Sequence, residues 1–132
     1  MKDDRINTNQ KLGSTMTSAD DCIFCKIARG DIKAAITYRD DRTIAFKDLG
    51  PQAPLHELVI PVRHIASLAE ATPDDVELFG HLMVVAARRA KESGQAAGGF
   101  RVVMNAGADA GQSVHHVHLH VLAGRPMAWP PG

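Results

Sequence analysis

The sequence has no long apolar run, and this absence excludes a membrane-spanning segment. Its longest apolar stretch, residues 82–87, falls far below the ~20 residues that a transmembrane helix requires. The N-terminal residues also lack the apolar core of a secretory signal. We therefore expect a soluble, cytoplasmic protein whose thiols are kept reduced.

An excess of charge of either sign is also missing. Lys and Arg together number 15, as do Asp and Glu, so no surplus of positive charge is available to neutralise a nucleic-acid backbone. The length of 132 residues suits one domain, which we place at residues 22–132. Residues 1–21 are polar and without periodicity, and we expect them to be a disordered leader or an appended extension.

The remaining residues alternate between strand-like and helix-like patterns. One strong helix is predicted from Thr72, a favourable N-cap followed by Pro73, to residue 93, with apolar side chains at helical spacing. A short helix is predicted over residues 22–28. Strands are predicted at residues 35–38, 43–46, 56–62, 100–105 and 116–122. This order favours an α+β domain with a mainly antiparallel five-stranded sheet, one long helix and one short helix.

Histidines alternate with apolar residues in the last predicted strand. A strand would place His116, His118 and His120 on one face and the apolar side chains on the other. A single histidine there would more often be a packing residue, but three in register point to chemistry. Two interpretations remain open at this level: neutral imidazoles that bind a catalytic zinc, or one imidazole that attacks phosphorus while its neighbours donate hydrogen bonds.

A loop rich in small residues and hydrogen-bond donors precedes this strand. Residues 105–113 include several glycines together with Asn105, Gln112 and Ser113. Glycines allow backbone N–H groups to approach an anion closely, and the polar side chains can reach its oxygens. The loop is therefore a candidate phosphate site, although most glycine-rich loops are only turns.

Two cysteines, Cys22 and Cys25, stand three positions apart. Such a pair is found in redox sites, in half of a zinc site and as two buried thiols. No thioredoxin-like pattern surrounds it, which argues against redox chemistry.

The motifs together resemble the histidine triad (HIT) family, and specifically its Hint branch of purine nucleoside phosphoramidases. Residues 116–122 fit the family signature at every position, and the likeness spans about residues 22–132. Leu49 stands where isoleucine is common, and His115 replaces a frequent tyrosine. Further matching segments are residues 46–49, 51–54, 56–64, 80–83, 111–114 and 129–132.

The resemblance implies hydrolysis of the P–N bond of purine nucleoside 5′-phosphoramidates, such as AMP-NH2 or AMP-lysine, with no cofactor in the chemistry. His118 would be the nucleophile that forms a nucleotidyl-histidine, and His120 and His56 would hold the phosphate oxygens. One of these two histidines or an ordered water would protonate the leaving amine. The implied nucleotide site adds Asp48 at the ribose, Leu49 and Phe24 near the base, and Asn105, Gly111, Gln112 and catalytic Ser113 at the phosphate.

Several bacterial members of the resembled family bind structural zinc, and here Cys22, Cys25, His64 and His116 would be its ligands. The family also forms a homodimer in which two sheets join, the long helix contributes to the interface and the tail around Trp129 lies near the partner's site. Three rival functions remain: a dinucleoside polyphosphate hydrolase, a nucleotide-binding regulatory or scaffold protein with low turnover, and a metallohydrolase with zinc on the triad.

Overall fold

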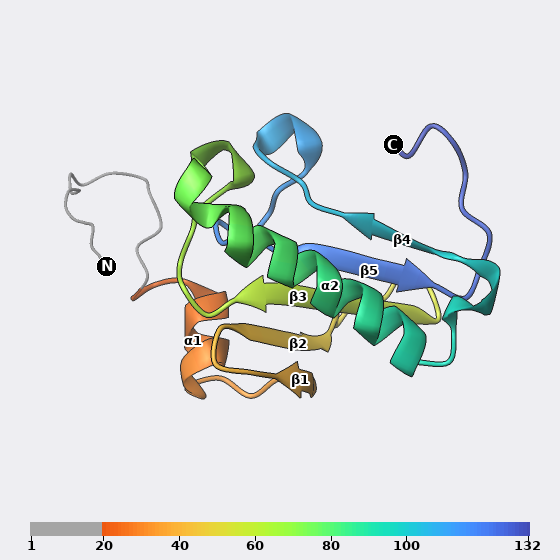
Figure 1. Cartoon of the computed structure of the whole chain (residues 1–132), viewed down its shortest axis with the longest axis horizontal. Helices are drawn as coiled ribbons and strands as arrows, with labels where there is room; N and C mark the ends of the chain where they lie inside the picture. The colour runs from red at the N-terminus through yellow and green to blue at the C-terminus, as the bar shows by residue number, and fades with distance from the viewer. Residues whose placement is uncertain (1–19) are drawn as a thin grey trace.

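A five-stranded antiparallel sheet forms the centre of residues 20–132, the part of the chain that the computed structural model describes (Figure 1). The strand order is β1-β2-β3-β5-β4, so β1 and β4 are the two edges. This architecture confirms the expected α+β fold. The leader expected at residues 1–21 lies outside the described residues, apart from residues 20 and 21. The strands are β1 (Ile36–Arg39), β2 (Thr43–Lys47), β3 (Leu55–Pro61), β4 (Phe100–Val103) and β5 (Leu119–Ala123).

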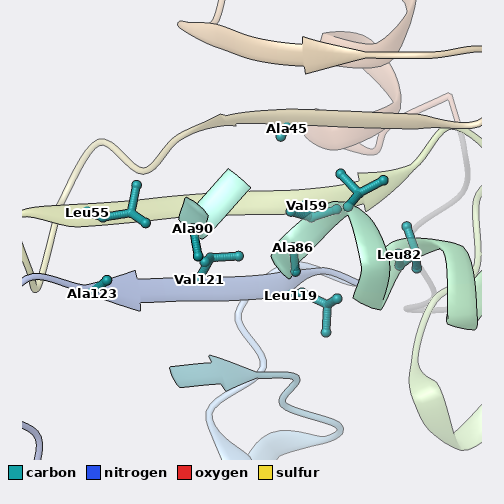
Figure 2. Close-up of a cluster of buried hydrophobic side chains, with 10 residues drawn as sticks. Ala45, Leu55, Val59, Leu82, Ala86, Ala90, Leu119, Val121 and Ala123 are labelled. Carbon is teal, nitrogen blue, oxygen red and sulfur yellow. The ribbon is translucent and has the colours of Figure 1, made fainter. Parts of the chain in front are cut away.

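The long helix α2 (Val76–Glu92) crosses one face of the sheet. A capping box around the 3-10 turn Pro73–Asp75 fixes its start. The Thr72 side chain accepts a hydrogen bond from the backbone of the turn, and the Asp75 side chain accepts one from the backbone N–H of Thr72. Apolar side chains on the buried side of α2 pack onto β3 and β5 (Figure 2). The fully buried residues of this core include Leu82, Ala86, Ala90, Val59, Val121 and Ala123.

A second core lies on the opposite face of the sheet, under the short helix α1 (Ile23–Arg29). Phe24 of α1 packs edge-on against Phe46 of β2, with ring centroids 5.5 Å apart. Gly30 ends the helix in the left-handed conformation, at φ 85°, which glycine adopts without steric cost. Short 3-10 helices also occur at Leu68–Glu70, Ala96–Gly98 and Ala108–Ala110. No helix within residues 20–132 is long and apolar enough to cross a membrane.

The strand predicted for residues 116–122 begins later than expected, at Leu119. The backbone N–H of His116 donates to the carbonyl of Val114, and the N–H of Val117 donates to the carbonyl of Ile65. Both bonds lie outside the sheet ladder, so regular alternation does not extend to His116. The prediction that all three imidazoles share one strand face is therefore wrong, and His116 points into a separate cluster.

Candidate active site

Three histidine rings meet on the face of the sheet that α2 leaves uncovered. His56 belongs to β3, His120 to β5, and His118 immediately precedes β5. The ring centroids of His118 and His120 are 5.1 Å apart, as are those of His56 and His120. His56 and His118 are buried, whereas His120 is partly exposed. The structure thus brings together the three histidines that the sequence assigned to the reaction.

The orientation of His118 is set by the backbone two residues earlier. Its Nδ1 lies 2.7 Å from the carbonyl oxygen of His116, which can only accept, so Nδ1 carries the proton and donates it. The other ring nitrogen, Nε2, consequently holds a lone pair in the neutral ring. Burial lowers the pKa of His118, and the ring of Phe24 packs edge-on against it at a centroid distance of 5.1 Å. His118 therefore presents an unprotonated nitrogen.

A chain of hydrogen bonds also determines the tautomer of His120. The backbone N–H of Gln52 donates to Nδ1 of His56 at 3.0 Å, so a neutral His56 carries its proton on Nε2. That Nε2 lies 2.9 Å from Nδ1 of His120, which accepts and leaves the His120 proton on Nε2. Burial, together with the neighbouring His118 and His56, lowers the pKa of His120 to about 4. His120 is consequently a neutral N–H donor at physiological pH.

The three residues assigned to the nucleoside differ in their surroundings and exposure. Asp48 lies beside the histidines, with one carboxylate oxygen 3.5 Å from Nε2 of His56 and the other accepting from the N–H of Gly50 at 2.7 Å. Phe24 is buried against His118. Leu49 is completely exposed. Asp48 is thus close to the histidine rings, whereas the contact of Leu49 with a base stays a prediction.

In the loop before the histidines, the polar side chains have different roles. The Gln112 amide accepts from the N–H of Gly107 at 2.9 Å and donates to the carbonyls of Ala66 and Val114 at 2.7 and 3.0 Å. This side chain therefore holds the loop in shape. Among the described residues, no group holds the side chains of Asn105 and Ser113, which remain available for a ligand.

The two cysteines and two further histidines form a second, separate cluster. The donor atoms of Cys22, Cys25, His64 and His116 all lie within 4.8 Å of one another. The His64 and His116 Nδ1 atoms are 3.2 Å apart, and Cys25 Sγ lies 3.3 and 3.5 Å from them. A hydrogen bond from Cys25, together with His116 and His64, lowers the pKa of Cys22. Such spacings fit four ligands around one ion at the Zn–S and Zn–N distances of about 2.3 and 2.0 Å.

The outer hydrogen bond of His116 suits metal binding as well. Its Nε2 lies 2.8 Å from the carbonyl oxygen of Pro61, so Nε2 carries the proton and Nδ1 presents its lone pair to the cysteines. The His116 side chain is fully buried and does not take part in the triad of rings described above. The cluster joins α1 to the loops beside β3 and β5.

An open cavity of about 500 Å³ lies beside His56 and His120. Asn105, Val103 and the C-terminal tail line it, together with two arginines, Arg101 of β4 and Arg125 of the tail. Reasoning from the sequence missed both arginines. The signal for Arg101 was its spacing, because residues 101, 103 and 105 alternate along a strand and so share one face.

Comparisons with known proteins agree over the described domain. A family model described as "Scavenger mRNA decapping enzyme C-term binding" matches residues 21–128. A HIT-like protein of Synechocystis is 52% identical over 114 residues, which are 86% of this chain and 99% of that protein. A solved HIT family hydrolase from Legionella pneumophila is 45% identical, with a TM-score of 0.82 over 84% of this chain and 99% of that one. A histidine triad protein from Clostridium difficile is 46% identical, with a TM-score of 0.79 over 86% and 97% of the two chains.

Proposed function

Because this chain belongs to the histidine triad (HIT) family of hydrolases, we propose that it cleaves the P–N bond of purine nucleoside 5′-phosphoramidates through a covalent nucleotidyl-His118 intermediate. The observation that carries the proposal is the 2.7 Å hydrogen bond from Nδ1 of His118 to the carbonyl of His116. It leaves the lone pair of Nε2 free to attack phosphorus.

The reaction has two steps in this arrangement. Nε2 of His118 bonds to the α-phosphorus as the P–N bond breaks, while the neutral His120 donates a hydrogen bond from Nε2 to a phosphate oxygen. The departing amine takes its proton from a water molecule, and the hydroxide that remains attacks the nucleotidyl-histidine in the second step, which releases the nucleoside monophosphate and regenerates His118. His56 supports this role of His120, since its Nε2 lies 2.9 Å from Nδ1 of His120.

Polar groups around the histidines fit the charge that builds on the phosphate oxygens. Asn105 and Ser113 have side chains that no other described residue holds, so they can donate to those oxygens. We assign Asp48 to the ribose hydroxyls, which its carboxylate can accept. Gln112 acts indirectly in this scheme, because its amide is used to shape the loop.

We also propose that Cys22, Cys25, His64 and His116 hold a structural zinc ion. Four thiolate and imidazole ligands close a tetrahedral site, so the ion would link α1 to the sheet and supply no chemistry. The fit rests on the donor set and on the 2.8 Å hydrogen bond from His116 to Pro61, which directs Nδ1 toward the cysteines.

A homodimer completes the proposal. Val76, Met83 and Val84 are exposed on the side of α2 that faces away from the sheet, and Phe100 is exposed on the edge strand β4. Apolar side chains at i, i+7 and i+8 form one stripe on a helix. This stripe and the free β4 edge are the surfaces through which two copies would join their sheets.

Rapid-quench mass spectrometry with adenosine 5′-phosphoramidate tests the reaction. We expect a nucleotidyl adduct on His118 during turnover, and a loss of activity of at least about 10³-fold in His118→Ala because the nucleophile is gone. The matched control is His115→Ala, an exposed histidine outside the triad, which should retain activity. Cleavage by His118→Ala at the original rate would refute the proposal. Zinc retained by His118→Ala would separate this route from a metal on the triad.

A further inference from the structure

The chain that leaves β5 passes close to the loop before β3, residues 48–54. Leu55 pairs with Ala123, so the start of β3 lies beside the end of β5 (Figure 1). Gly124 then adopts a φ of 99°, and a Cβ atom there would lie 2.7 Å from Cβ of Pro54. Glycine alone combines this conformation with so close a contact. The backbone after β5 is therefore seated directly on the loop.

Arg125, the next residue, joins the tail to this loop through its guanidinium group. Nε donates to the carbonyl of Gln52 at 2.8 Å, and Nη1 donates to the carbonyl of the following residue at 2.9 Å. Within residues 20–132, the other hydrogen bonds of the loop are made between its own residues or with His56. Arg125 thus fastens the middle of the loop to the end of β5.

The loop in turn controls His56, through the backbone N–H of Gln52. This N–H donates to Nδ1 of His56 at 3.0 Å, and Nε2 of the same ring lies 2.9 Å from Nδ1 of His120. A hydrogen bond between two neutral imidazoles can run in either direction, because each ring nitrogen donates in one tautomer and accepts in the other. The donor at the outer end, the N–H of Gln52, therefore determines which direction is taken.

One of the two directions suits the proposed reaction. With the proton of His56 on Nε2, His120 accepts at Nδ1 and carries its own proton on Nε2, which can donate to a phosphate oxygen. In the reverse direction, Nε2 of His120 holds a lone pair that repels the same oxygen. The carboxylate of Asp48 also favours a proton on Nε2 of His56, but at 3.5 Å it is farther away than an ordinary hydrogen-bond partner.

Resting on the proposed phosphoramidase reaction, we infer that Arg125 is a positioning residue for His120. By holding the carbonyl of Gln52, its guanidinium keeps the N–H of that residue directed at His56. His56 then donates to His120, and His120 presents its Nε2 proton to the phosphate. In this scheme Arg125 acts through two other residues and does not need to touch the substrate.

Nitrogen NMR spectra of the imidazoles in 15N-labelled, ligand-free protein test the inference, because they show which nitrogen of each ring carries the proton. At pH 8.5, well above the ordinary histidine pKa of about 6.5, wild-type His56 and His120 should both carry their protons on Nε2. Arg125→Met removes the donors but keeps a long side chain, and it should convert both rings together to a mixture of tautomers. Arg125→Lys keeps a donor and should restore most of the wild-type pattern.

The turnover of adenosine 5′-phosphoramidate gives a second readout. Arg125→Met should lower kcat about fivefold, since only part of the protein then has a donor at Nε2 of His120. The leaving amine of this substrate bears no substituent, so the loss does not report recognition of a leaving group. Arg101→Met is the matched control, because Arg101 lines the same cavity and donates to the carbonyl of Ala128 at 3.0 Å instead of to the loop. It should leave both tautomers unchanged.

Wild-type tautomers in Arg125→Met overturn the inference, and a lower kcat with those tautomers would assign Arg125 to direct contact with the substrate instead. Equal tautomer changes in Arg125→Met and Arg101→Met also overturn it, since they would show a general effect of the tail. The spectra need no substrate, which separates this test from that of the proposed function. If the wild type does not cleave the phosphoramidate but Arg125→Met alters both rings, the proposed reaction fails and the control of His120 by Arg125 stands.

Discussion

Hydrogen-bond partners, more than position in the sequence, distinguish the three histidines at 116, 118 and 120. His116 donates from Nε2 to Pro61, whereas His118 donates from Nδ1 to the carbonyl of His116. These opposite tautomers expose Nδ1 in one ring and Nε2 in the other. Imidazoles of identical chemistry are thereby suited to the two roles that we propose, His116 as a metal ligand and His118 as a nucleophile.

The pH dependence of the reaction should reflect the environment of His118. Burial lowers its pKa below the ordinary value of 6.5, so the ring is neutral at pH 7 and becomes protonated only as the pH falls below that value. We expect the acid limb of kcat/KM for adenosine 5′-phosphoramidate to have its midpoint below pH 6.5.

Initial rates between pH 4 and pH 8, corrected for uncatalysed hydrolysis, measure this midpoint. A midpoint at or above 6.5 would contradict the assignment of a buried, neutral nucleophile. The exposed His115 provides the control, since His115→Ala should leave the midpoint unchanged.

At the scale of elements, β3 carries a buried charge on the side that faces α2. Glu57 is almost fully buried, and its carboxylate accepts from Nε and Nη2 of Arg89 on α2 at 2.8 and 3.1 Å. Thr37 of β1 donates to the same carboxylate at 2.8 Å. This bidentate pair links three elements across the apolar core.

Removal of one partner of this pair should be costly. Arg89→Met leaves the carboxylate of Glu57 without its counter-charge, and we expect the free energy of unfolding to fall by about 3–5 kcal/mol. The double variant with Glu57→Leu should recover much of this loss, because no buried charge remains. Urea denaturation measures both effects.

The neighbouring Arg88 is the control for that series. Its side chain is 58% exposed and pairs with Glu92, so Arg88→Met should cost less than about 1 kcal/mol. A double variant less stable than Arg89→Met would contradict this explanation, because the Glu57 side chain would then stabilise the fold even without its counter-charge.

The helices and most strands were predictable because their signals are local. The start of α2 was evident from Thr72 and Pro73, whose capping and backbone preferences act within one turn. The start of β5 was not, because it depends on the bond from Val117 to Ile65, a residue far away in the chain. For the same reason, spacing within the strand did not reveal that His116 turns away from His118.

The same difference between local signals and long-range contacts applies to the residues of the site. The alternating histidines and the cysteine pair were evident from spacing alone, and resemblance supplied the grouping of both cysteines with His64 and His116 that the structure displays. The positions of Arg101 and Arg125 depended on strand register and on the path of the tail. Local spacing indicates only that Arg101 shares a strand face with Asn105, whereas the neighbours of both arginines depend on contacts between segments far apart in the chain.

On the scale of the whole molecule, we propose that a zinc ion bound by the cysteine–histidine cluster links α1 to the sheet. We expect about one zinc per chain, and we expect chelation to lower the melting temperature by about 10 °C, since the ion binds only the folded protein. Metal analysis and thermal unfolding measure these effects.

Matched variants sharpen the zinc prediction. Cys25→Ser should abolish metal binding, whereas His115→Ala, which alters an adjacent residue outside the cluster, should preserve it. A wild-type protein that holds no zinc after purification with metal present would contradict the assignment.

The association of two copies is the second prediction at this scale. Val84 is 67% exposed on α2, and a charge there would be buried without a partner in the proposed dimer. Val84→Glu should therefore shift the protein from dimer to monomer in light scattering coupled to size-exclusion chromatography. Asp31→Asn, at an exposed charged position just after α1 and away from α2, serves as a control that should stay dimeric. A monomeric wild type would refute the proposed assembly.

One residue, His116, connects the cysteine–histidine cluster to the proposed nucleophile. The side chain of His116 faces the cysteines, while its carbonyl oxygen holds Nδ1 of His118. A change in the position of His116 on the cysteine side would therefore also shift the carbonyl that orients His118, the nucleophile that we propose. A substitution at His116 would remove a proposed ligand and also disturb a fully buried side chain next to that carbonyl. The contribution of the proposed ion is therefore measured more cleanly by substitutions at the cysteines and His64.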